Sequence, residues 1–312
     1  MSGTLLRVEG LDIARRDDPS LRVVRHLSFD IARGEILAVV GESGCGKTVT
    51  SLALTGLLPD GLVVGGGTLS FDGAPLRPVE LRGRRIGMIF QDPMSALNPM
   101  FTIGDQITEM LRAHLGLGKA AARARAIELL ALVRLPDPGR IIDTYPARLS
   151  GGQRQRVVIA IAIACNPDLV IADEPTTALD PTIQAQIMAL LAGLRETLGI
   201  AIMLITHNLG LVAQAADRVM VMYAGRKVEE APVEALFARP LHPYARRLLA
   251  ATPHPGRTQT RLAEIPGLVP SVFDLPPGCP FAPRCDVAVA RCHASEPALS
   301  GGAGHRAACH LA

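Results

Sequence analysis

Short continuous apolar runs recur along this 312-residue chain, and each is followed by a glycine or a polar residue. Residues 35–40, 169–172 and 200–206 have the apolar character of strands that are buried on both faces of a parallel sheet. Residues 181–198 form a helical pattern between the last two runs. The order strand, helix, strand predicts an α/β fold whose ligand site lies at the carboxyl ends of the strands.

Other segments predict additions to this core. Strands are expected at residues 5–8 and 27–31, as a small antiparallel layer, and at 68–71 and 85–90, with a helix at 48–58. Residues 104–135 are Ala-rich with few β-branched runs, which predicts a helical subdomain of about residues 99–165. We expect a loop at 136–146 to close it, before a helix at 153–165.

Composition excludes several classes of protein. Hydrophobic residues make up 48% of the chain but aromatic residues only 3%, a balance typical of an α/β enzyme. No apolar run reaches the roughly 18 to 20 residues that a membrane-spanning helix requires, and the first residues lack an export signal, so we expect a cytoplasmic protein. The net charge of +3 is small and scattered, which disfavours a nucleic-acid surface.

A phosphate-binding loop follows the first buried strand. The segment fits G-x-x-x-x-G-K-[ST] between a predicted strand and a predicted helix, as that motif requires. Its backbone N–H groups and the helix N-terminus would bind phosphates, Lys47 would neutralise the β and γ phosphates, and Thr48 would ligate Mg²⁺. The predicted nucleotide-binding residues of the loop are Gly41, Glu42, Ser43, Gly44, Cys45, Gly46, Lys47, Thr48 and Val49.

Polar residues also end the other buried strands. Asp173 follows residues 169–172, where it would hold Mg²⁺ through water, and Glu174 would orient and deprotonate the attacking water. Gln91 and His207 follow two further strands. Taken alone, each of those two is more typical of a surface or capping residue than of a catalytic one.

The most specific segment is Leu149-Ser150-Gly151-Gly152-Gln153, which opens a predicted helix. Such a turn offers a hydroxyl and backbone N–H groups to a phosphate. Together with the phosphate loop and the Asp173-Glu174 pair, it resembles the ATP-binding cassette (ABC) ATPases. In chain order, the loop, Gln91, this turn, Asp173-Glu174, Asp180 and His207 resemble the Walker A, Q-loop, signature, Walker B, D-loop and H-loop segments of that family, over about the first 235 residues.

The resemblance implies a RecA-like parallel core with an antiparallel layer and an inserted helical subdomain. It implies ATP and Mg²⁺ as ligands, with Thr48, Gln91 and Asp173 serving the metal and with Glu174, His207 and Gln91 in catalysis. Two cassettes are expected to meet head to tail. ATP would then lie between the Lys47 loop of one copy and residues Ser150, Gly151, Gly152 and Gln153 of the other, with Asp180 nearby.

Two positions depart from the family pattern. The family usually stacks adenine on an aromatic residue before the loop, but residues 13–25 contain none. Arg15, Arg16 or Leu21 could cover the base instead, by cation–π or apolar contact. Asn208 stands where many relatives have Asp after the His.

Longer strings resemble one branch, the ATPase subunits of bacterial oligopeptide and dipeptide permeases, whose relatives serve nickel, opines and glutathione. They include residues 85–94, 172–180 and 182–186, and His242-Pro243-Tyr244. The branch implies two transmembrane permease subunits, a second ABC ATPase subunit and, indirectly, an external solute-binding protein, with this chain peripheral on the cytoplasmic face of the inner membrane. The alternative from another class is a soluble ABC protein acting on ribosomes or nucleic acid, which the single cassette and modest charge disfavour.

The C-terminal segment carries a second chemical signal. Four of the six cysteines, Cys279, Cys285, Cys292 and Cys309, lie close together in the sequence. Disulfides are disfavoured in a reducing cytoplasm, and four thiols suit tetrahedral zinc or an iron–sulfur cluster. The resemblance favours a [4Fe-4S] cluster, with Zn²⁺ and unligated thiols as alternatives and His293, His305 and His310 as other candidate ligands. We therefore expect a nucleotide-binding domain at residues 1–235 and a cysteine-rich extension at 236–312.

Overall fold

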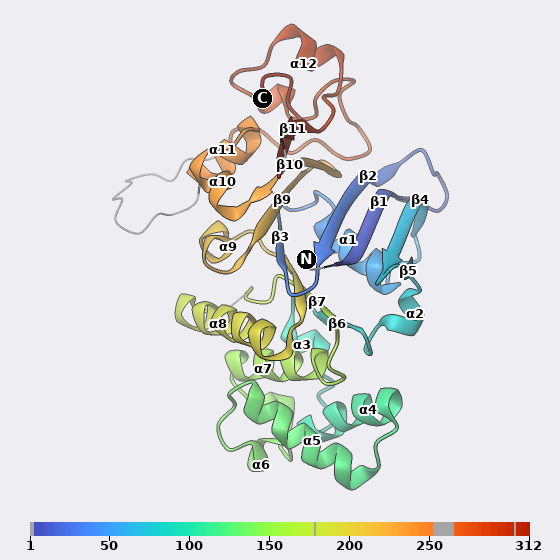
Figure 1. Ribbon diagram of the computed structural model, residues 1–312, viewed down its shortest axis with the longest axis vertical. Helices are drawn as coiled ribbons and strands as arrows, with labels where there is room; N and C mark the ends of the chain where they lie inside the picture. The colour runs from blue at the N-terminus through green and yellow to red at the C-terminus, as the bar shows by residue number, and fades with distance from the viewer. Residues whose placement is uncertain (1–2, 178, 252–264, 303) are drawn as a thin grey trace. The chain divides into compact units, whose positions relative to one another are not determined.

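A computed structural model describes residues 3–177, 179–251, 265–302 and 304–312 (Figure 1). The chain forms two compact units. The first unit comprises Met1–Leu76 and Leu204–Ala312, and the second comprises Arg77–Met203. This division follows contacts in space, so the boundary near residue 235 stays a prediction.

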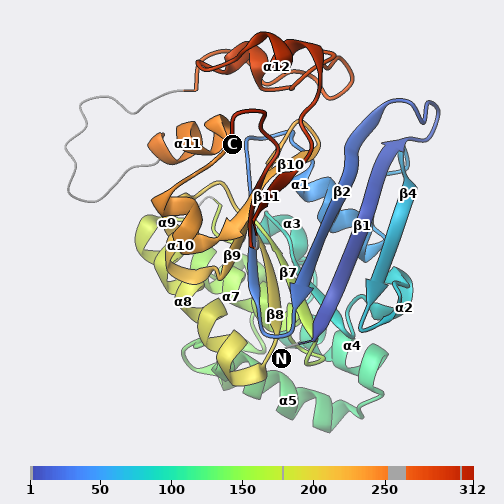
Figure 2. The same ribbon diagram turned by 45° about the horizontal axis from the view of Figure 1, so that its top comes forward.

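An antiparallel sheet forms one layer of the first unit. Its strands are β1 (Thr4–Arg15), β2 (Arg22–Ala32), β4 (Leu62–Phe71) and β5 (Ala74–Pro75), in the order β2-β1-β4-β5. Figure 2 shows the three long strands side by side. The antiparallel layer is confirmed, but its strands extend well beyond residues 5–8, 27–31 and 68–71, because irregular register steps let pairing continue where the apolar alternation breaks.

The second sheet of the first unit carries the phosphate loop. Strand β3 (Ile36–Val40) is buried throughout and pairs in parallel with β9 (Arg218–Tyr223). β9 turns at Ala224 and Gly225, both with positive φ, into the antiparallel strand β10 (Arg226–Pro232). The C-terminal strands β12 (His305–Ala307) and β11 (Ser300–Gly302) extend this sheet. The core is therefore a mixed sheet, because a tight hairpin returns the chain without a helical crossover.

Helices and short turns complete the first unit. They are α1 (Lys47–Thr55), α9 (Leu209–Ala215), α10 (Val233–Ala238), α11 (Pro243–Ala250), the 3₁₀ turn η2 (Ala282–Arg284) and α12 (Ala290–Ala294). The predicted helix at residues 48–58 is confirmed in type, and it ends earlier because Gly56 takes a left-handed conformation with φ 67°.

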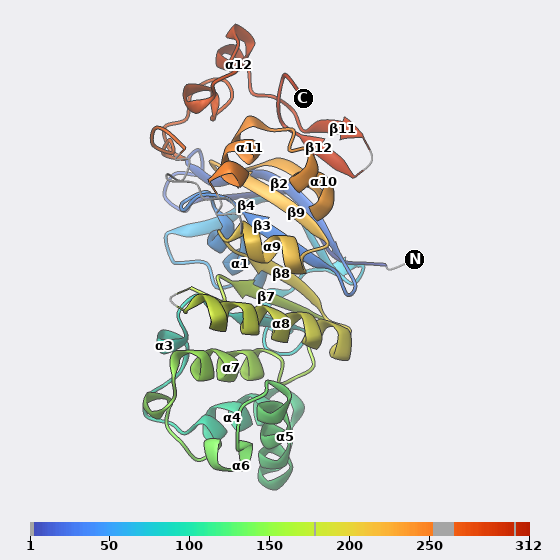
Figure 3. The same cartoon turned by 90° about the vertical axis from the view of Figure 1, so that its left-hand side faces the viewer.

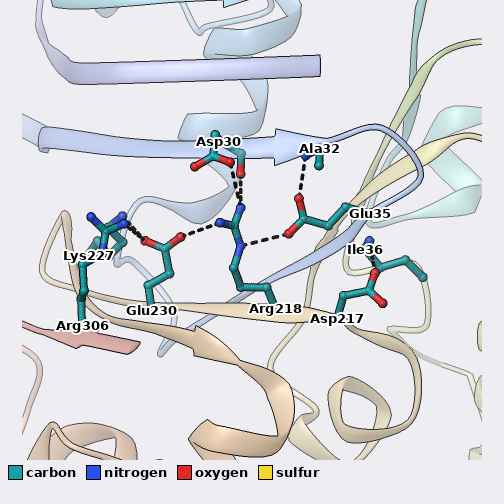
Figure 4. A network of polar contacts seen from close by, with 9 residues as sticks. All are labelled: Asp30, Ala32, Glu35, Ile36, Asp217, Arg218, Lys227, Glu230 and Arg306. Carbon is teal, nitrogen blue, oxygen red and sulfur yellow. Dashed lines mark hydrogen bonds and ion pairs between the residues drawn. The ribbon is translucent and has the colours of Figure 1, made fainter. Parts of the chain in front are cut away.

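Within the first unit, a network of charges connects the C-terminal strand β12 to β10 and β9 (Figure 4). Arg218 on β9 binds Glu35 at 3.0 Å and Glu230 at 3.2 Å, and its guanidinium also donates to the Asp30 carbonyl. Glu230 is 3% exposed and accepts in turn from Arg306 of β12 at 3.1 Å. These charges are compensated pairwise, so the network fastens β12 to β10 and β9 without leaving an isolated buried charge.

The second unit contains parallel strands and most of the helices. β6 (Ile86–Ile89) and β7 (Leu169–Asp173) pair in parallel, with Ile86 opposite Leu169. β8 (Ala201–Ile205) carries the chain from the second unit into the first. The helices are α2 (Pro78–Leu81), α3 (Pro93–Ala96), α4 (Ile103–Leu115), α5 (Lys119–Leu132), α6 (Pro138–Ile141), α7 (Gly151–Ala162) and α8 (Pro181–Leu198), with the 3₁₀ turn η1 (Pro146–Arg148).

The helical subdomain is confirmed by the packing of α4 to α7 (Figure 3). Ile107 and Leu111 of α4, and Ala122, Ala126 and Leu129 of α5, are all fully buried. Their spacing of three or four residues places them along one face of each helix. The prediction of an unbroken loop at 136–146 is wrong, because Pro138 starts the short helix α6 with the fixed φ that a first helical turn accepts.

Candidate nucleotide site

The phosphate loop connects β3 to α1 and depends on glycines at both ends. Gly41 has φ 154°, and a Cβ there would lie 2.2 Å from the Met222 carbonyl oxygen and 2.8 Å from Cys45 Sγ. Gly46 precedes α1 with φ 97°, a conformation that L side chains rarely adopt. The chain can therefore make this turn against β9 only without side chains at these two positions.

Lys47 folds back over the loop. Its side chain is buried, and Nζ donates to the carbonyl oxygens of Gly41 at 2.7 Å and Glu42 at 3.0 Å. Cys45 is also buried, and burial raises the pKa of its thiol. Ser43, Gly44 and Thr48 are exposed, and Val49 is half-buried. The ammonium group is thus held within the loop, and the exposed positions present the loop to a ligand.

Glu42 has contacts that the sequence did not predict. Arg284 Nη1 and Nη2 donate to its two carboxylate oxygens at 2.8 and 3.0 Å. The Glu42 N–H donates to the Tyr244 hydroxyl at 2.8 Å. Arg284 lies 242 residues after Glu42, in the cysteine-rich segment. The only sequence signal was the His242-Pro243-Tyr244 string, whose contact with the loop no local pattern reveals.

His242 positions this tyrosine. The imidazole is buried, and burial lowers the pKa of His242 to about 4, so the ring is neutral near pH 7. A neutral ring has an acceptor nitrogen, and Nδ1 accepts from the Tyr244 N–H at 3.1 Å, which caps α11. Tyr244 then packs against the rings of Tyr223 and Phe281, at 4.7 and 5.4 Å between centroids.

The acidic pair lies in the second unit, at the end of β7. Asp173 is buried as the last residue of the strand. Glu174 has φ 47°, an uncommon conformation for a residue with a side chain and one that clusters at functional sites. Gln91 Nε2 donates to Glu174 Oε2 at 3.2 Å, and Thr177 Oγ1 donates to the same oxygen at 2.7 Å. The structure therefore brings Gln91 and Glu174 together, and adds Thr177, which the sequence did not single out.

The Ser150 turn is a capping box at the start of α7. Ser150 Oγ accepts from the Gln153 N–H at 3.3 Å, and Gln153 Oε1 accepts from the Ser150 N–H at 3.0 Å. Ser150 and Gly151 are exposed, while Gly152 and Gln153 are half-buried. The serine hydroxyl and the first helical N–H groups thus lie at an exposed helix N-terminus, an arrangement that suits an anion.

Asp180 and His207 lie at other turns. Asp180 caps α8 by accepting from the Ile183 N–H at 3.0 Å. Ala178, in the same predicted D-loop, lies outside the described residues. His207 is exposed, and the next residue, Asn208, caps α9 by accepting from Gly210 and Leu211. Since an Asp carboxylate would accept the same bonds, the departure at Asn208 preserves the cap.

The residues expected to cover adenine have other contacts. Arg15 pairs with Asp17, and Arg16 Nε donates to the Asp60 carbonyl at 2.9 Å. Leu21 is half-buried, and its carbonyl accepts from the Arg15 N–H at 3.0 Å. The choice among Arg15, Arg16 and Leu21 stays a prediction.

The four C-terminal cysteines line one pocket, together with His242 and His310. Gly278 makes this possible, since a Cβ there would lie 2.2 Å from the Cys292 carbonyl oxygen, which accepts from the Cys279 N–H at 2.7 Å. Within the described ranges, no three His, Cys, Asp or Glu side chains are arranged to hold a metal ion. Burial raises the pKa of the Cys279 and Cys285 thiols.

The histidines near these cysteines have other partners. His305 Nε2 lies 2.8 Å from the buried Glu229 carboxylate, and His310 Nε2 lies 2.9 Å from the Ser295 carbonyl. His293 is exposed on α12. Cysteine is therefore the donor type that the pocket supplies most directly.

In the part of the chain that the structure covers, no helix is both long and apolar enough for a membrane span.

The chain is similar to known proteins over nearly its whole length. Residues 24–177 match the ABC transporter family, and residues 228–292 match the C-terminal region of oligopeptide/dipeptide transporters. The chain is 48% identical to the dipeptide transport ATP-binding protein DppD of Escherichia coli, over 98% of this chain and 96% of DppD. It is 50% identical to the probable peptide ABC transporter ATP-binding protein y4tR of Sinorhizobium fredii, over 92% and 89% of the two chains.

Solved cassettes share the fold. The chain resembles cbiO1 of Clostridium perfringens, part of the transporter complex cbiONQ, with a TM-score of 0.65 and 28% identity over 76% of this chain and 91% of that one. It also resembles the dimeric cassette MJ0796 in a post-hydrolysis state bound to ADP and Pi, with a TM-score of 0.65 and 26% identity over 73% and 99%. The two family matches and the alignment with DppD together extend over both the nucleotide segments and the C-terminal extension. The chain belongs to the ABC transporter family, as an ATP-binding subunit of its oligopeptide/dipeptide branch.

Proposed function

We propose that this protein hydrolyses ATP to drive the import of dipeptides or oligopeptides through a bacterial membrane transporter. The observation that carries the proposal is the union, in one chain, of a segment that matches the ABC transporter family with the oligopeptide/dipeptide C-terminal region. Relatives named for peptide import align with nearly the whole chain. Nickel, opines and glutathione are the alternative cargoes of the same branch.

In the first unit, the loop binds the phosphates. Lys47, now bound to the Gly41 and Glu42 carbonyls, would turn to the β and γ phosphate oxygens, and the Thr48 hydroxyl would be a ligand of Mg²⁺. The exposed loop N–H groups and the α1 N-terminus add positive potential. His207 acts from the end of β8, close to the reacting phosphate, as the family resemblance implies.

In the second unit, Glu174 activates the water that attacks the γ-phosphate. Its carboxylate is oriented by Gln91 and Thr177 and accepts the proton of the attacking water. Gln91 and Asp173 would help to hold Mg²⁺, as the family resemblance implies. When bound, Mg²⁺ neutralises charge that develops on the phosphate oxygens.

We assign the Ser150–Gln153 turn and Asp180 to a second copy's nucleotide. A cassette dimer clasps ATP through the turn of the opposite subunit, and ATP favours closure because it contacts both subunits only in the closed state. The bacterial cassette MJ0796, which this chain resembles, has a dimeric structure. The partners of this chain are then two membrane permeases and a second ABC ATPase, fed by an external solute-binding protein, with the chain on the cytoplasmic face of the inner membrane.

We propose that the cysteine pocket holds a [4Fe-4S] cluster, as the family resemblance implies. Cys279, Cys285, Cys292 and Cys309 would hold it. A single zinc ion bound by four thiolates at about 2.3 Å stays the alternative. When bound, such a cluster would cross-link the four segments of the extension that carry these cysteines.

The transport proposal is tested in a strain that lacks this chain. Wild type should restore uptake of labelled di- and tripeptides, and Glu174→Gln should not, while Glu196→Gln, a change on the exposed side of α8, serves as the control. In purified transporter, Glu174→Gln should lose about 10²- to 10⁴-fold in ATP turnover, as expected for loss of a general base. Restored uptake of nickel or glutathione in place of peptides would reassign the cargo, and undiminished turnover in Glu174→Gln would remove the base.

The cluster is tested separately. Anaerobically purified protein should contain iron and acid-labile sulfide near a four-to-one ratio to protein, and Cys292→Ser should lose both. Stoichiometric zinc without sulfide would favour the zinc alternative. A metal-free protein with a folded extension would reject both.

A further inference from the structure

Every polar group of Glu42, the second residue of the phosphate loop, is bound. Its carboxylate accepts two bonds from Arg284, its N–H donates to Tyr244, and its carbonyl accepts from Lys47. Arg284 and Tyr244 both belong to the C-terminal extension. One residue at the start of the loop is thus held by the extension on one side and by the phosphate-binding lysine on the other.

Arg284 is itself firmly held. Its side chain is 4% exposed, and Nε and Nη2 donate to the Pro266 and Ile265 carbonyls at 3.0 and 3.2 Å. Nη1 also donates to the Tyr223 hydroxyl at 3.3 Å. Such a guanidinium loses little freedom when it binds a carboxylate, so its two bonds to Glu42 impose a direction on the loop.

Arg284 also links the loop to the cysteine pocket. It ends η2, the turn between Cys279 and Cys285, and backbone bonds run from Ala282 N–H to the Cys279 carbonyl and from Cys285 N–H to the Ala282 carbonyl. A rearrangement of either cysteine would therefore move the residue that binds Glu42.

The charge of Glu42 connects its pairing with Arg284 to nucleotide binding. A carboxylate in a loop that binds a polyanion repels it, and the Glu42 side chain is 27% exposed, so solvent screens that charge only in part. A paired guanidinium cancels the repulsion. The hydrogen bonds to Glu42 also raise the pKa of Arg284, which keeps this cation charged.

We propose that the C-terminal extension is a working part of the nucleotide site, with Arg284 and Tyr244 as positioning residues that orient the loop through Glu42 and neutralise its carboxylate. The inference rests on the proposed function in requiring that the loop binds nucleotide. The cysteine-rich segment then sets nucleotide affinity as well as its own fold.

The test measures MgADP binding to the full-length purified subunit by calorimetry, because ADP binding involves no hydrolysis. Arg284→Met should raise the Kd for MgADP about tenfold or more, in line with loss of a charged hydrogen-bonded pair. Glu42→Gln in the Arg284→Met background should bring the Kd back to within about threefold of wild type, since the unpaired carboxylate is gone. Arg247→Met is the matched control, because Arg247 pairs with Asp286 in the same extension at 3.4 Å.

Three outcomes would overturn the inference. They are an unchanged Kd in folded Arg284→Met, an equal loss in Arg247→Met, or no recovery in the double variant, which would leave Arg284 a merely structural residue.

Should Arg284→Met fail to fold, Arg284→Lys replaces it. A lysine retains the charge without the two-pronged bond, so a Kd about threefold above wild type is expected and an unchanged Kd would count against the inference. Failure of wild type to bind MgADP would instead refute the proposed function.

Discussion

The phosphate loop and the Ser150 turn both present N–H groups at a helix N-terminus, but they are held in opposite ways. The loop is held by residues distant in sequence, as Tyr244 and Arg284 lie 202 and 242 positions from Glu42. The Ser150 turn is held by two reciprocal bonds between residues three apart. The first depends on the tertiary structure of the first unit, and the second is built into four consecutive residues.

The difference matters for function. A locally capped turn keeps its shape whatever its surroundings do, which suits a surface that must meet another subunit. A loop held by a distant segment changes when that segment changes, so its affinity for nucleotide is open to control from the extension. Substitutions in the extension should therefore change nucleotide binding at the loop. Substitutions in the Ser150 turn should change only the turn itself.

The largest contrast is expected between two glycines. Gly41→Ala would place a Cβ 2.2 Å from the Met222 carbonyl at a positive φ, whereas Gly151→Ala would meet only Leu179 Cδ2 at 3.4 Å. We expect Gly41→Ala to lower the free energy of unfolding by about 3 kcal/mol, from overpacking and backbone strain. Gly151→Ala should stay within about 0.5 kcal/mol of wild type. Denaturant unfolding measures both, and equal losses would break the comparison.

Tyr244→Phe should have the next largest effect. It removes the acceptor of the Glu42 N–H and leaves that donor without its partner, at a cost of about 1–2 kcal/mol. The Kd for MgADP should rise severalfold as well, because the loop loses one of its two anchors in the extension. Tyr145→Phe, at a half-exposed tyrosine of the second unit, is the control and should change neither quantity. A stability loss without any change in Kd would separate the anchor from nucleotide binding.

Ser150→Ala should act locally. Loss of the cap is expected to destabilise α7 by about 1 kcal/mol, and Ser150→Thr, which keeps a hydroxyl acceptor, should recover most of it. MgADP binding to the isolated subunit should be unchanged, since the two capping bonds of this turn lie within it. A weakened Kd for MgADP in Ser150→Ala would show that the turn is not independent of the loop.

The smallest effect is predicted for Asn208→Asp. Either side chain accepts from the N–H groups of Gly210 and Leu211, so stability should change by less than about 0.5 kcal/mol. ATP turnover of the assembled transporter should also stay near wild type. A large change in turnover would assign Asn208 a role beyond the cap of α9.

Some elements of these regions could be predicted from the sequence and others could not. Buried strands such as β3 and β7 were predicted because continuous apolar runs mark them, and the helix Pro181–Leu198 matched its predicted bounds because Asp180 and Gly199 cap it. The strands β9 to β12 were missed, and for β12 the reason is that it pairs with β10, about 76 residues earlier in the chain. Thr177 was missed because a threonine after an acidic pair has no distinctive spacing.

The amino-acid sequence alone determined the family, the phosphate loop and the capped Ser150 turn, because each is encoded in a short run whose spacing dictates its hydrogen bonds. Only the tertiary structure decided what holds the loop. Arg284 and Tyr244 act on Glu42 across more than 200 positions. Contacts at that separation depend on how the extension packs against β9 and β10, which no local pattern records.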